Sequence, residues 1–354
     1  MKRTTIFLVL LLSLSLVISS CARQAAPPQA QDQQVLKDTS KELSQKQVKF
    51  ATISRDAQEL MIVYSMSDMF FPKVGFTEKP EVVLTEETLP GLTSGQVWVA
   101  MDETSTIWAA MDEGNLDLVI VAVDKDNEER ILGARPGIKT AQDLSPESKI
   151  SGGAVGEYDE LILREILTNI GVDPNNVQII AMGGGADARM KAMIAGQLDA
   201  GIQQPRNIAP LTEAGGVILY NQPAEAVQDT YVVTRDYLNQ HRDEVCAFVK
   251  AEVMSKQWAY EGADHKANLQ PALDIVKKYS VDPTENELAG WVHELEGNIS
   301  LDGGATVAAL DKFQKDLKSL EVLSADFQWR DHADFSCLWE AQQALGLQQR
   351  PEKQ

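Results

Sequence analysis

The sequence has few of the residues that hold transition metals and a shortage of positive charge. Its four histidines are His241, His265, His293 and His332. None of them lies two or four positions from another, so the clusters expected of a zinc or copper site are missing. Lys and Arg total 32 against 52 Asp and Glu, a formal charge of −20. Such a field repels nucleic-acid phosphates. We therefore expect no metal, no cofactor and no nucleic-acid partner.

The N-terminal apolar run is too short to cross a bilayer, which takes about 20 residues. It extends from Ile6 to Ile18, follows Lys2 and Arg3, and is followed by Ser19, Ser20 and Cys21. A basic start, a short apolar core and small residues after it are typical of a cleaved secretion signal.

Residues 18–21, Ile-Ser-Ser-Cys, also resemble the bacterial lipobox, in which the cysteine is lipidated and becomes the first mature residue. The alternative is an ordinary signal peptide with a chance cysteine. We expect a signal peptide over residues 1–20, lipidation of Cys21 and a flexible tether over residues 21–47, which are rich in Gln, Ala and Pro. An amphipathic helix over residues 36–48 is the alternative for the end of the tether. Loss of Lys2 and Arg3 leaves 30 basic and 52 acidic residues, a charge of −22.

Cysteines are scarce, and only Cys246 and Cys337 remain once Cys21 is assigned to lipid. In an extracytoplasmic protein these two could form a disulfide. The alternative is two buried, inert thiols on helices. Both interpretations stay open at this point.

Short apolar runs alternate with helical patterns over most of residues 48–235, which indicates an α/β fold built from β-α-β units. The predicted strands cover residues 48–53, 81–85, 96–101, 116–123, 131–134, 149–152, 177–182, 200–202, 217–219 and 231–234. After Tyr237 the pattern becomes helical, and the predicted helices cover residues 239–260, 266–279, 284–296, 304–320 and 335–345.

An internal repeat relates residues 99–120 to residues 180–202. Each unit reads as a strand, a polar or glycine-rich loop, a helix, a glycine and a second strand. Five identities stand at a constant offset of 82: Ala110/Ala192, Met111/Met193, Gly114/Gly196, Leu116/Leu198 and Asp117/Asp199. Glycines at these places suit the left-handed end of a helix. The repeat predicts two similar lobes; the alternative is two generic β-α-β crossovers.

Ligands of open α/β sheets bind beyond the carboxyl ends of the strands, where helix N-termini present free N–H groups. The equivalent loops 102–106 and 183–187 stand at such positions. We therefore expect them to face each other across a cleft between the lobes.

Four elements of residues 134–202 form a further pattern: residues 138–144 with their Asp-Leu, the glycine-rich turn 152–156, the Gly-Val-Asp-Pro spacing within 167–177, and Gly-Gln-Leu-Asp-Ala at 196–200. With these elements the stretch resembles the type 2 periplasmic solute-binding proteins of ABC importers, in the branch that binds aliphatic sulfonates, nitrate and thiamine-pyrimidine precursors. The resemblance extends more loosely over residues 48–260.

This resemblance implies a two-lobed α/β clamp with a hinge and C-terminal helices. Lobe 1 would comprise residues 48–135 and 235–345, lobe 2 residues 136–234, and residues 346–354 a tail, with crossings near Arg135 and Thr234. It also implies a small-molecule solute and an ABC permease as partners. With the lipid anchor, we expect a monomer on the cell membrane that faces the periplasm or the cell exterior.

Carried over by position, the resemblance implies a set of candidate ligand contacts. In lobe 1 they are Ser54, Arg55, Thr104, Ser105 and Thr106; in lobe 2 they are Gly153, Ala154, Gly156, Tyr158, Gly184, Gly185, Gln203, Gln204 and Arg206. The hydroxyls could equally cap helices, and Arg206 could be solvated. Trp98 and Trp108 are predicted to be core residues.

The expected cleft loops carry more carboxylates than bases. Asp102, Glu103, Glu157, Asp159 and Asp187 stand against Arg55, Arg189 and Arg206. If several carboxylates face inward, like charge disfavours a strongly anionic ligand and favours a neutral or amine-bearing one.

Two other functions compete with transport. An enzyme of vitamin-precursor chemistry, which some members of the similar family perform, could use the same fold, although no nucleophile and base motif occurs in the sequence. A ligand sensor for a membrane receptor has the same sequence signature. Residues 124–129 have a weak likeness to a calcium loop and are instead predicted to form a charged hairpin turn.

Overall fold

The computed structural model describes residues 42–53, 57–85, 87–114, 116–153 and 158–353. Thr39–Gln354 forms one compact unit, and the description below concerns its described residues. The predicted signal peptide, Cys21 and most of the expected tether lie outside them. In the described ranges, no helix is both long and apolar enough to cross a membrane.

The first sheet has the strand order β2-β1-β3-β10-β4. Its strands are β1 (Lys49–Thr52), β2 (Glu81–Leu84), β3 (Val99–Glu103), β4 (Leu118–Val123) and β10 (Asp229–Thr234). β1 pairs in parallel with β2 and β3, whereas β10 lies antiparallel between β3 and β4. We call the part of the chain built on this sheet lobe 1.

The second sheet repeats this arrangement with the order β7-β6-β8-β5-β9. Its strands are β5 (Asn127–Ala134), β6 (Lys149–Ser151), β7 (Gln178–Ile179), β8 (Ala200–Gln203) and β9 (Val217–Glu225). β6 is parallel to β7 and β8, and β5 lies antiparallel between β8 and β9. We call this part lobe 2. Each strand that the sequence predicted overlaps one in the structure.

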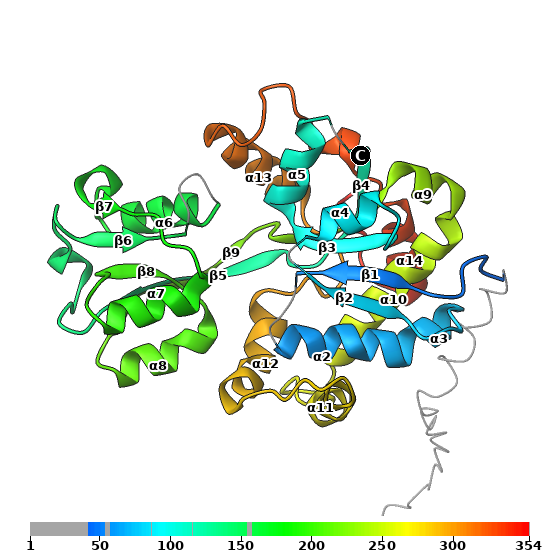
Figure 1. Cartoon of the computed structure of the whole chain (residues 1–354), viewed down its shortest axis with the longest axis horizontal. Helices are drawn as coiled ribbons and strands as arrows, with labels where there is room; N and C mark the ends of the chain where they lie inside the picture. Colours follow the sequence, from blue (N-terminus) through cyan, green and yellow to red (C-terminus); the bar gives the residue numbers. More distant parts are fainter. Residues whose placement is uncertain (1–41, 54–56, 86, 115, 154–157, 354) are drawn as a thin grey trace, which may run out of the picture. The chain divides into compact units, whose positions relative to one another are not determined.

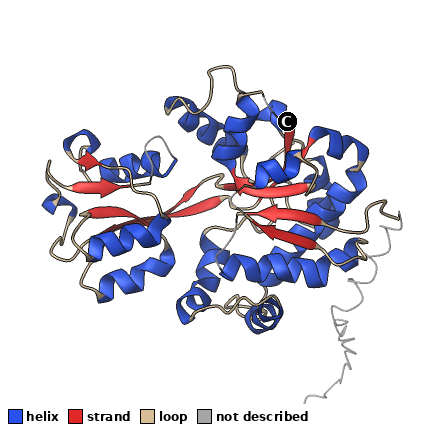
Figure 2. Cartoon of the chain, in the orientation of Figure 1, coloured by secondary structure: helices blue, strands red, loops and turns tan. Residues whose placement is uncertain are grey.

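Helices cover both sheets (Figures 1 and 2). Lobe 1 has α2 (Ala57–Ser65), α3 (Phe71–Val74), α4 (Thr88–Thr93), α5 (Thr104–Asp112), α9 (Arg235–Gln240), α10 (Arg242–Ala259), α11 (Leu269–Lys278), α12 (Glu285–Gly297), α13 (Val307–Ser319) and α14 (Ser336–Leu345). Lobe 2 has α6 (Tyr158–Asn169), α7 (Gly185–Ile194) and α8 (Ile208–Glu213). The helices predicted after Tyr237 are all present.

The two lobes have different cores. The core of lobe 1 is rich in aromatic side chains, among them Phe50, Phe71, Trp108 and Phe248, and it includes the buried Trp98, as predicted. The core of lobe 2 is smaller and aliphatic, with residues such as Ile150, Leu163, Ile166 and Leu167. The fold is therefore a two-lobed α/β clamp with helices at its C-terminal end, as the resemblance implied.

The chain passes between the sheets at residues 124–126 and 226–228, earlier than the expected crossings near Arg135 and Thr234. β5 belongs to the second sheet and β10 to the first, and β5 and β9 run paired between the lobes (Figure 1). An apolar run predicts a strand but not the sheet in which that strand pairs. The charged hairpin turn predicted at residues 124–129 is also wrong, because Asp124, Lys125 and Asp126 are buried in the first crossing.

The correspondence between repeat units must also be corrected. The repeat equates β3, α5 and β4 with β7, α7 and β8, but β3 is an inner strand and β7 an edge strand. By sheet position β3 corresponds to β8 and β4 to β9. The prediction of two similar lobes is confirmed, because the two sheets share one topology. The five identities at the offset of 82, however, align two generic β-α-β crossovers that occupy different positions in their sheets. Gly114 and Gly196 both have a φ of 71° after their helices, so the identities reflect a shared local requirement.

The end of the expected tether is held on lobe 1. Leu43 and Val48 are buried, and residues 42–48 form no helix. The backbone N–H groups of Ser44 and Gln45 donate to Oε1 of Glu244 on α10, at 2.6 and 3.0 Å. A flexible tether that reaches residue 47 is therefore contradicted, since these contacts begin by residue 43.

Cys246 on α10 and Cys337 on α14 are joined by a disulfide, with their Cα atoms 4.6 Å apart. The bond links two helices that pack against each other in lobe 1.

Candidate functional site

A pocket of about 550 Å³ lies where the two lobes meet. Lobe 1 contributes residues at the end of β3 and the start of α5, on α2 and on α12. Lobe 2 contributes the starts of α6 and α7, the end of β8 and the start of β5. The polar lining includes Gln58, Glu59, Glu103, Ser105, Thr106, Lys125, Glu128, Glu129, Arg130, Asp159, Arg189, Gln203, Gln204, Arg206, Gln228, Glu294 and Asn298.

Most of the predicted contacts that the structure describes line this pocket. They are Ser105, Thr106, Gly153, Gly184, Gly185, Gln203, Gln204 and Arg206. The two loops of the repeat thus meet at one pocket, although their units are not equivalent in topology. Gly184 is the N-cap of α7 with a φ of 87°, a conformation that glycine adopts at little cost.

Other predicted contacts do not reach the pocket or lie outside the described residues. Thr104 is fully buried, and its Oγ1 is 3.4 Å from Oγ1 of Thr230 on β10. The hydroxyl that begins α5 therefore packs in lobe 1 instead of lining the cavity. Ser54, Arg55, Ala154 and Gly156 lie outside the described ranges, as does the side chain of Tyr158 at the start of α6.

Each of the two buried arginines of lobe 2 is held by partners in its own lobe. Arg189 donates through Nε to the carbonyl oxygen of Ile202, at 2.9 Å, and its guanidinium lies 3.3 Å from Oδ2 of Asp159. Arg130 pairs with Glu165 on α6, and its Nε lies 3.8 Å from Oε2 of Glu128. Both side chains are at most 8% exposed.

Glu128 is a strongly perturbed carboxyl of the pocket lining. Burial, together with the charge of Asp159, raises its pKa to about 8, and Arg130 offsets only part of this effect. At neutral pH most of this carboxyl is therefore protonated unless a further positive charge approaches it.

The first crossing is anchored by two buried lysines. Lys125 pairs with Glu59 on α2 and lies 3.4 Å from Asp229 and 3.5 Å from Glu294 on α12. Burial opposes its charge, yet these carboxylates raise its pKa well above the ordinary value. Burial also raises the pKa of Asp229 well above its usual range. One ammonium group thus serves three acids.

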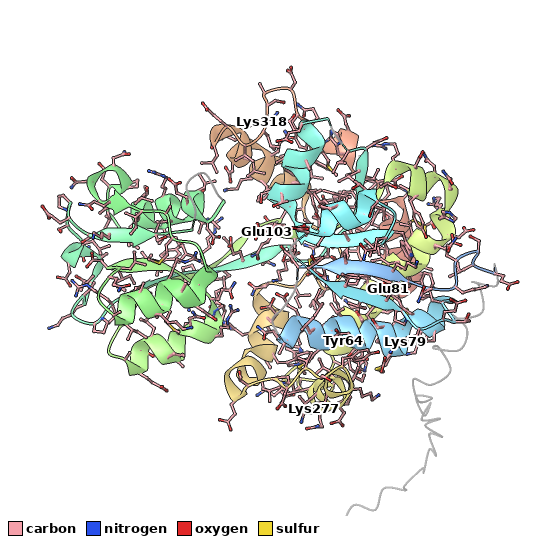
Figure 3. The ribbon with its side chains drawn as sticks, in the orientation of Figure 1. Tyr64, Lys79, Glu81, Glu103, Lys277 and Lys318 are labelled. Atoms are coloured by element: carbon pink, nitrogen blue, oxygen red, sulfur yellow. A yellow bond between two sulfur atoms is a disulfide. The ribbon has the colours of Figure 1, made fainter. Side chains whose placement is uncertain are left out.

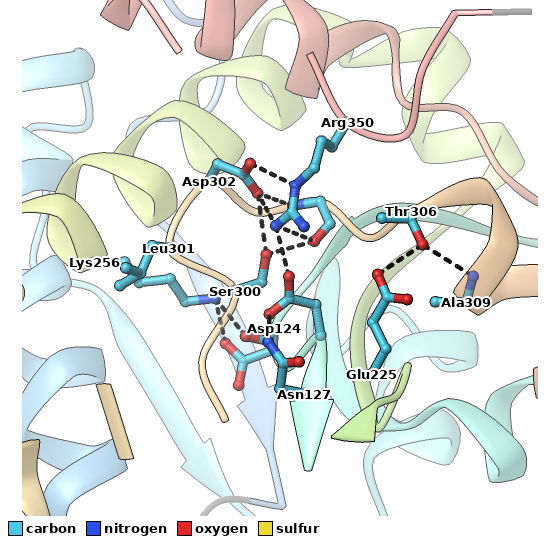
Figure 4. A network of polar contacts seen from close by, with 12 residues as sticks. Asp124, Asn127, Glu225, Lys256, Ser300, Leu301, Asp302, Thr306, Ala309 and Arg350 are labelled. Carbon is cyan, nitrogen blue, oxygen red and sulfur yellow. Dashed lines mark hydrogen bonds and ion pairs between the residues drawn. The ribbon is translucent and has the colours of Figure 1, made fainter. Parts of the chain in front are cut away.

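Lys256 on α10 is the second lysine (Figure 4). It lies 2.9 Å from Oδ1 of Asp124 and also pairs with Glu252. Burial disfavours the ionised form of Asp124, but the charges of Lys256 and Lys125 outweigh it and lower the pKa of that carboxyl. The backbone of the crossing is held too, because the N–H of Ser300 donates to the carbonyl oxygen of Asp124 at 2.8 Å.

Two ion pairs link helices of lobe 1 to lobe 2. His293 on α12 pairs with Glu129 on β5, and this hydrogen bond raises the pKa of the imidazole. Lys312 on α13 lies 3.2 Å from Oε1 of Glu165 on α6. Both pairs span the cleft that contains the pocket, so they would be stretched or broken if the lobes moved apart.

Sequence reasoning missed the contribution of α2, α12 and the first crossing. Gln58, Glu59, Glu128 and Glu294 line the pocket but stand in no loop that the fold class marks. The one available signal was the dense charge of residues 124–129, which a hairpin turn explained as well. Among the described residues, no group of three or more His, Cys, Asp or Glu is arranged to hold a metal ion.

Solved structures share this two-lobed architecture. The alkanesulfonate-binding protein SsuA from Xanthomonas axonopodis pv. citri, bound to MOPS, is 14% identical, with a TM-score of 0.58 over 82% of this chain and 98% of that one. The periplasmic nitrate-binding protein NrtA from Synechocystis PCC 6803 is 12% identical, with a TM-score of 0.63 over 86% and 90%. The desulfurization enzyme DSZB is 12% identical, with a TM-score of 0.59 over 84% and 99%.

At such identities the likeness defines the fold, which is the type 2 fold of the periplasmic binding proteins. The model of the NMT1/THI5-like family matches residues 81–265, which is 185 of the 354 residues. The chain belongs to this family. No curated protein matches the sequence.

Proposed function

We propose that this protein is the extracytoplasmic solute-binding subunit of an ABC-type importer. It captures a small organic solute between its lobes and delivers it to the permease. The observation that carries the proposal is the pocket of about 550 Å³ lined from both lobes, since pockets of about 300–1,000 Å³ suit small organic ligands. Two short crossings join the lobes, an arrangement that permits hinge closure around a ligand.

We assign ligand contacts to the loop and strand ends that meet at the pocket. Ser105 and Thr106 supply hydroxyls from α5, and Gly184 and Gly185 allow close approach to the backbone at the start of α7. Gln204 follows β8 and is exposed to the pocket. These groups suit the orientation of a polar solute by hydrogen bonds.

The proposed location of the protein in the cell rests on the apolar run and Cys21 near the N-terminus. We propose that Cys21 carries the lipid and that the chain is a monomer held on the membrane, facing the periplasm or the cell exterior. Fractionation of cells that express the full chain tests this: the wild type should sediment with membranes and Cys21→Ser should be soluble outside the cytoplasm. Membrane retention of Cys21→Ser would contradict the anchor.

Closure on a solute tests the binding role. Small-angle scattering should show a smaller radius of gyration when a compound that raises the Tm saturably is added. Enzymatic turnover of that compound would contradict a pure binding role and favour the alternative that DSZB represents on this fold. Binding without a change in transport by the permease would favour a sensor.

A further inference from the structure

The bases of the described pocket lining are all paired with carboxylates. Lys125 is shared among Glu59, Asp229 and Glu294. Arg130 pairs with Glu165, Arg189 with Asp159, and Arg206 lies 3.4 Å from Oδ1 of Asp187. An anionic solute would therefore have to compete with carboxylates for every base that the described lining offers.

Carboxylates also outnumber bases on the pocket wall. The described lining has six acids, Glu59, Glu103, Glu128, Glu129, Asp159 and Glu294, and four bases, Lys125, Arg130, Arg189 and Arg206. Glu103 stands at the end of β3 that is nearer lobe 2 (Figure 3). Glu165 and Asp187, which pair with Arg130 and Arg206, lie outside the lining.

The wall also holds hydrogen-bond acceptors to which no described residue donates. Gln203 is 2% exposed, and its Nε2 donates to the carbonyl oxygen of Ile202 at 2.8 Å. The Oε1 of Gln203 has no hydrogen-bond partner among the described residues, nor has Oε1 of Gln58, which is 6% exposed. Buried amide oxygens are rarely left unpaired, because each costs free energy until a donor arrives.

From the charge surplus and these two oxygens we propose that the solute is a small organic cation rich in N–H donors, an amine or an amidine. The inference rests on the proposed function and names the ligand class of the same pocket. The cation places its charge beside Glu128 and Asp159, and its N–H groups donate to the amide oxygens of Gln203 and Gln58. The raised pKa of Glu128 fits this role, since Arg130 offsets only part of the effect of burial on that carboxyl.

The test compares compounds that differ mainly in charge. The full chain is screened by thermal shift and then by calorimetry with benzylamine, butylamine, benzamidine and agmatine, with the matched alcohols, and with benzylsulfonate, MOPS and nitrate. We expect a saturable rise in Tm with amines or amidines and none with the sulfonates or nitrate.

Two variants and a control test where the bound cation lies in the pocket. Glu128→Gln should weaken binding of the cations about 10–100-fold, since hydrogen bonds to charged groups are the strong ones. Gln203→Met should weaken it about 3–10-fold and provides an independent measurement. Glu213→Gln is the matched control, because Glu213 is exposed on α8 outside the pocket, and it should bind as the wild type does.

The outcomes separate the ligand class from the binding role. Saturable binding of sulfonates or alcohols without cations would overturn the cation proposal and leave the solute-binding role standing. Binding of cations that is unchanged in both Glu128→Gln and Gln203→Met would overturn the placement. No response in any charge class would contradict the solute-binding role as well.

Discussion

The two lobes share one strand order but are stabilised by different interactions. Lobe 1 buries Lys256 with Asp124 and Glu252, carries a disulfide and packs aromatic rings around its sheet. Lobe 2 relies on aliphatic side chains and on arginines at the edge of the pocket. The lobe that holds both crossings in place is thus the one with the disulfide and the buried Lys256. Two lobes with the same strand order can therefore be stabilised by different side-chain interactions.

The largest expected effect is on the buried lysine of lobe 1. Lys256→Ala should lower the free energy of unfolding by about 3–5 kcal/mol, because it leaves the carboxylates of Asp124 and Glu252 buried without their cation. Arg164→Ala in lobe 2 breaks only the partly exposed pair with Glu160 and should cost about 1 kcal/mol or less. Urea denaturation measures both, and equal losses would contradict the contrast between the lobes.

The disulfide gives the next largest effect. The double variant Cys246→Ala, Cys337→Ala should lose about 2–5 kcal/mol, since the bond closes a sequence separation of 91 residues and restricts the unfolded chain. Reductant should lower the Tm of the wild type and leave the Tm of the double variant unchanged. An equal response of both proteins to reductant would show that the bond does not form in solution.

The third prediction concerns the pH dependence of ligand affinity. Glu128 faces Arg130, Asp159, Asp229 and Lys125, and its raised pKa of about 8 keeps it protonated at lower pH. Affinity for a cation should therefore rise about tenfold per pH unit below pH 8 and level off above it. Calorimetry at pH 6, 7, 8 and 9 checks this, and Glu128→Gln should remove the slope.

Glu128 also makes the stability of the ligand-free protein depend on pH, but stability falls as the pH rises, whereas affinity for a cation increases. Its pKa is higher in the folded protein than in the unfolded chain, so the folded state holds the proton more tightly. The contribution of Glu128 to stability is therefore full at acidic pH and declines as the pH rises from about 4.5 to about 8. Stability of Glu128→Gln relative to the wild type should increase over this window in the absence of ligand.

The smallest effect should be the same in both lobes. Gly114→Ala and Gly196→Ala should each cost about 1 kcal/mol, because both positions have a φ of 71° and an added Cβ would meet no atom within 4 Å. Gly91→Ala in α4 is the control, since its φ is not left-handed and its Cβ would make only an ordinary contact with Val97. Clearly unequal costs at Gly114 and Gly196 would contradict a purely local origin of the repeat.

The sequence predicts strands better than it predicts how they pair. The strands expected at residues 131–134 and 231–234 are present as β5 and β10, yet each lies in the other lobe from the one expected. Pairing depends on contacts between residues far apart in the chain, and the apolar pattern of a single strand carries no information about its neighbour. For the same reason, the identities at the offset of 82 indicate that two helices end in the same way, but they do not indicate where the neighbouring strands lie in their sheets.

The residues of the candidate site also differ in whether the sequence could predict them. Gly184 and Gly185 at the start of α7 could be predicted, because the fold class places ligands at helix starts beyond strand ends. Glu294 could not, since α12 reaches the pocket only through the packing of the C-terminal helices. The sequence shows that Glu128 is an acid, but it does not show that this side chain is buried in the pocket lining, and burial is the main cause of its raised pKa.

The contacts of Arg350 have a consequence for the order in which the protein is completed. Its guanidinium lies 2.6 Å from Oδ2 of Asp126 in the first crossing and 2.7 Å from Oδ2 of Asp302 (Figure 4). Residues 127–225 of lobe 2 form one continuous stretch, whereas lobe 1 takes up the chain on both sides of it. During synthesis lobe 2 can therefore assemble first. The contact of Arg350 with the first crossing can form only after both segments of lobe 1 have been synthesised.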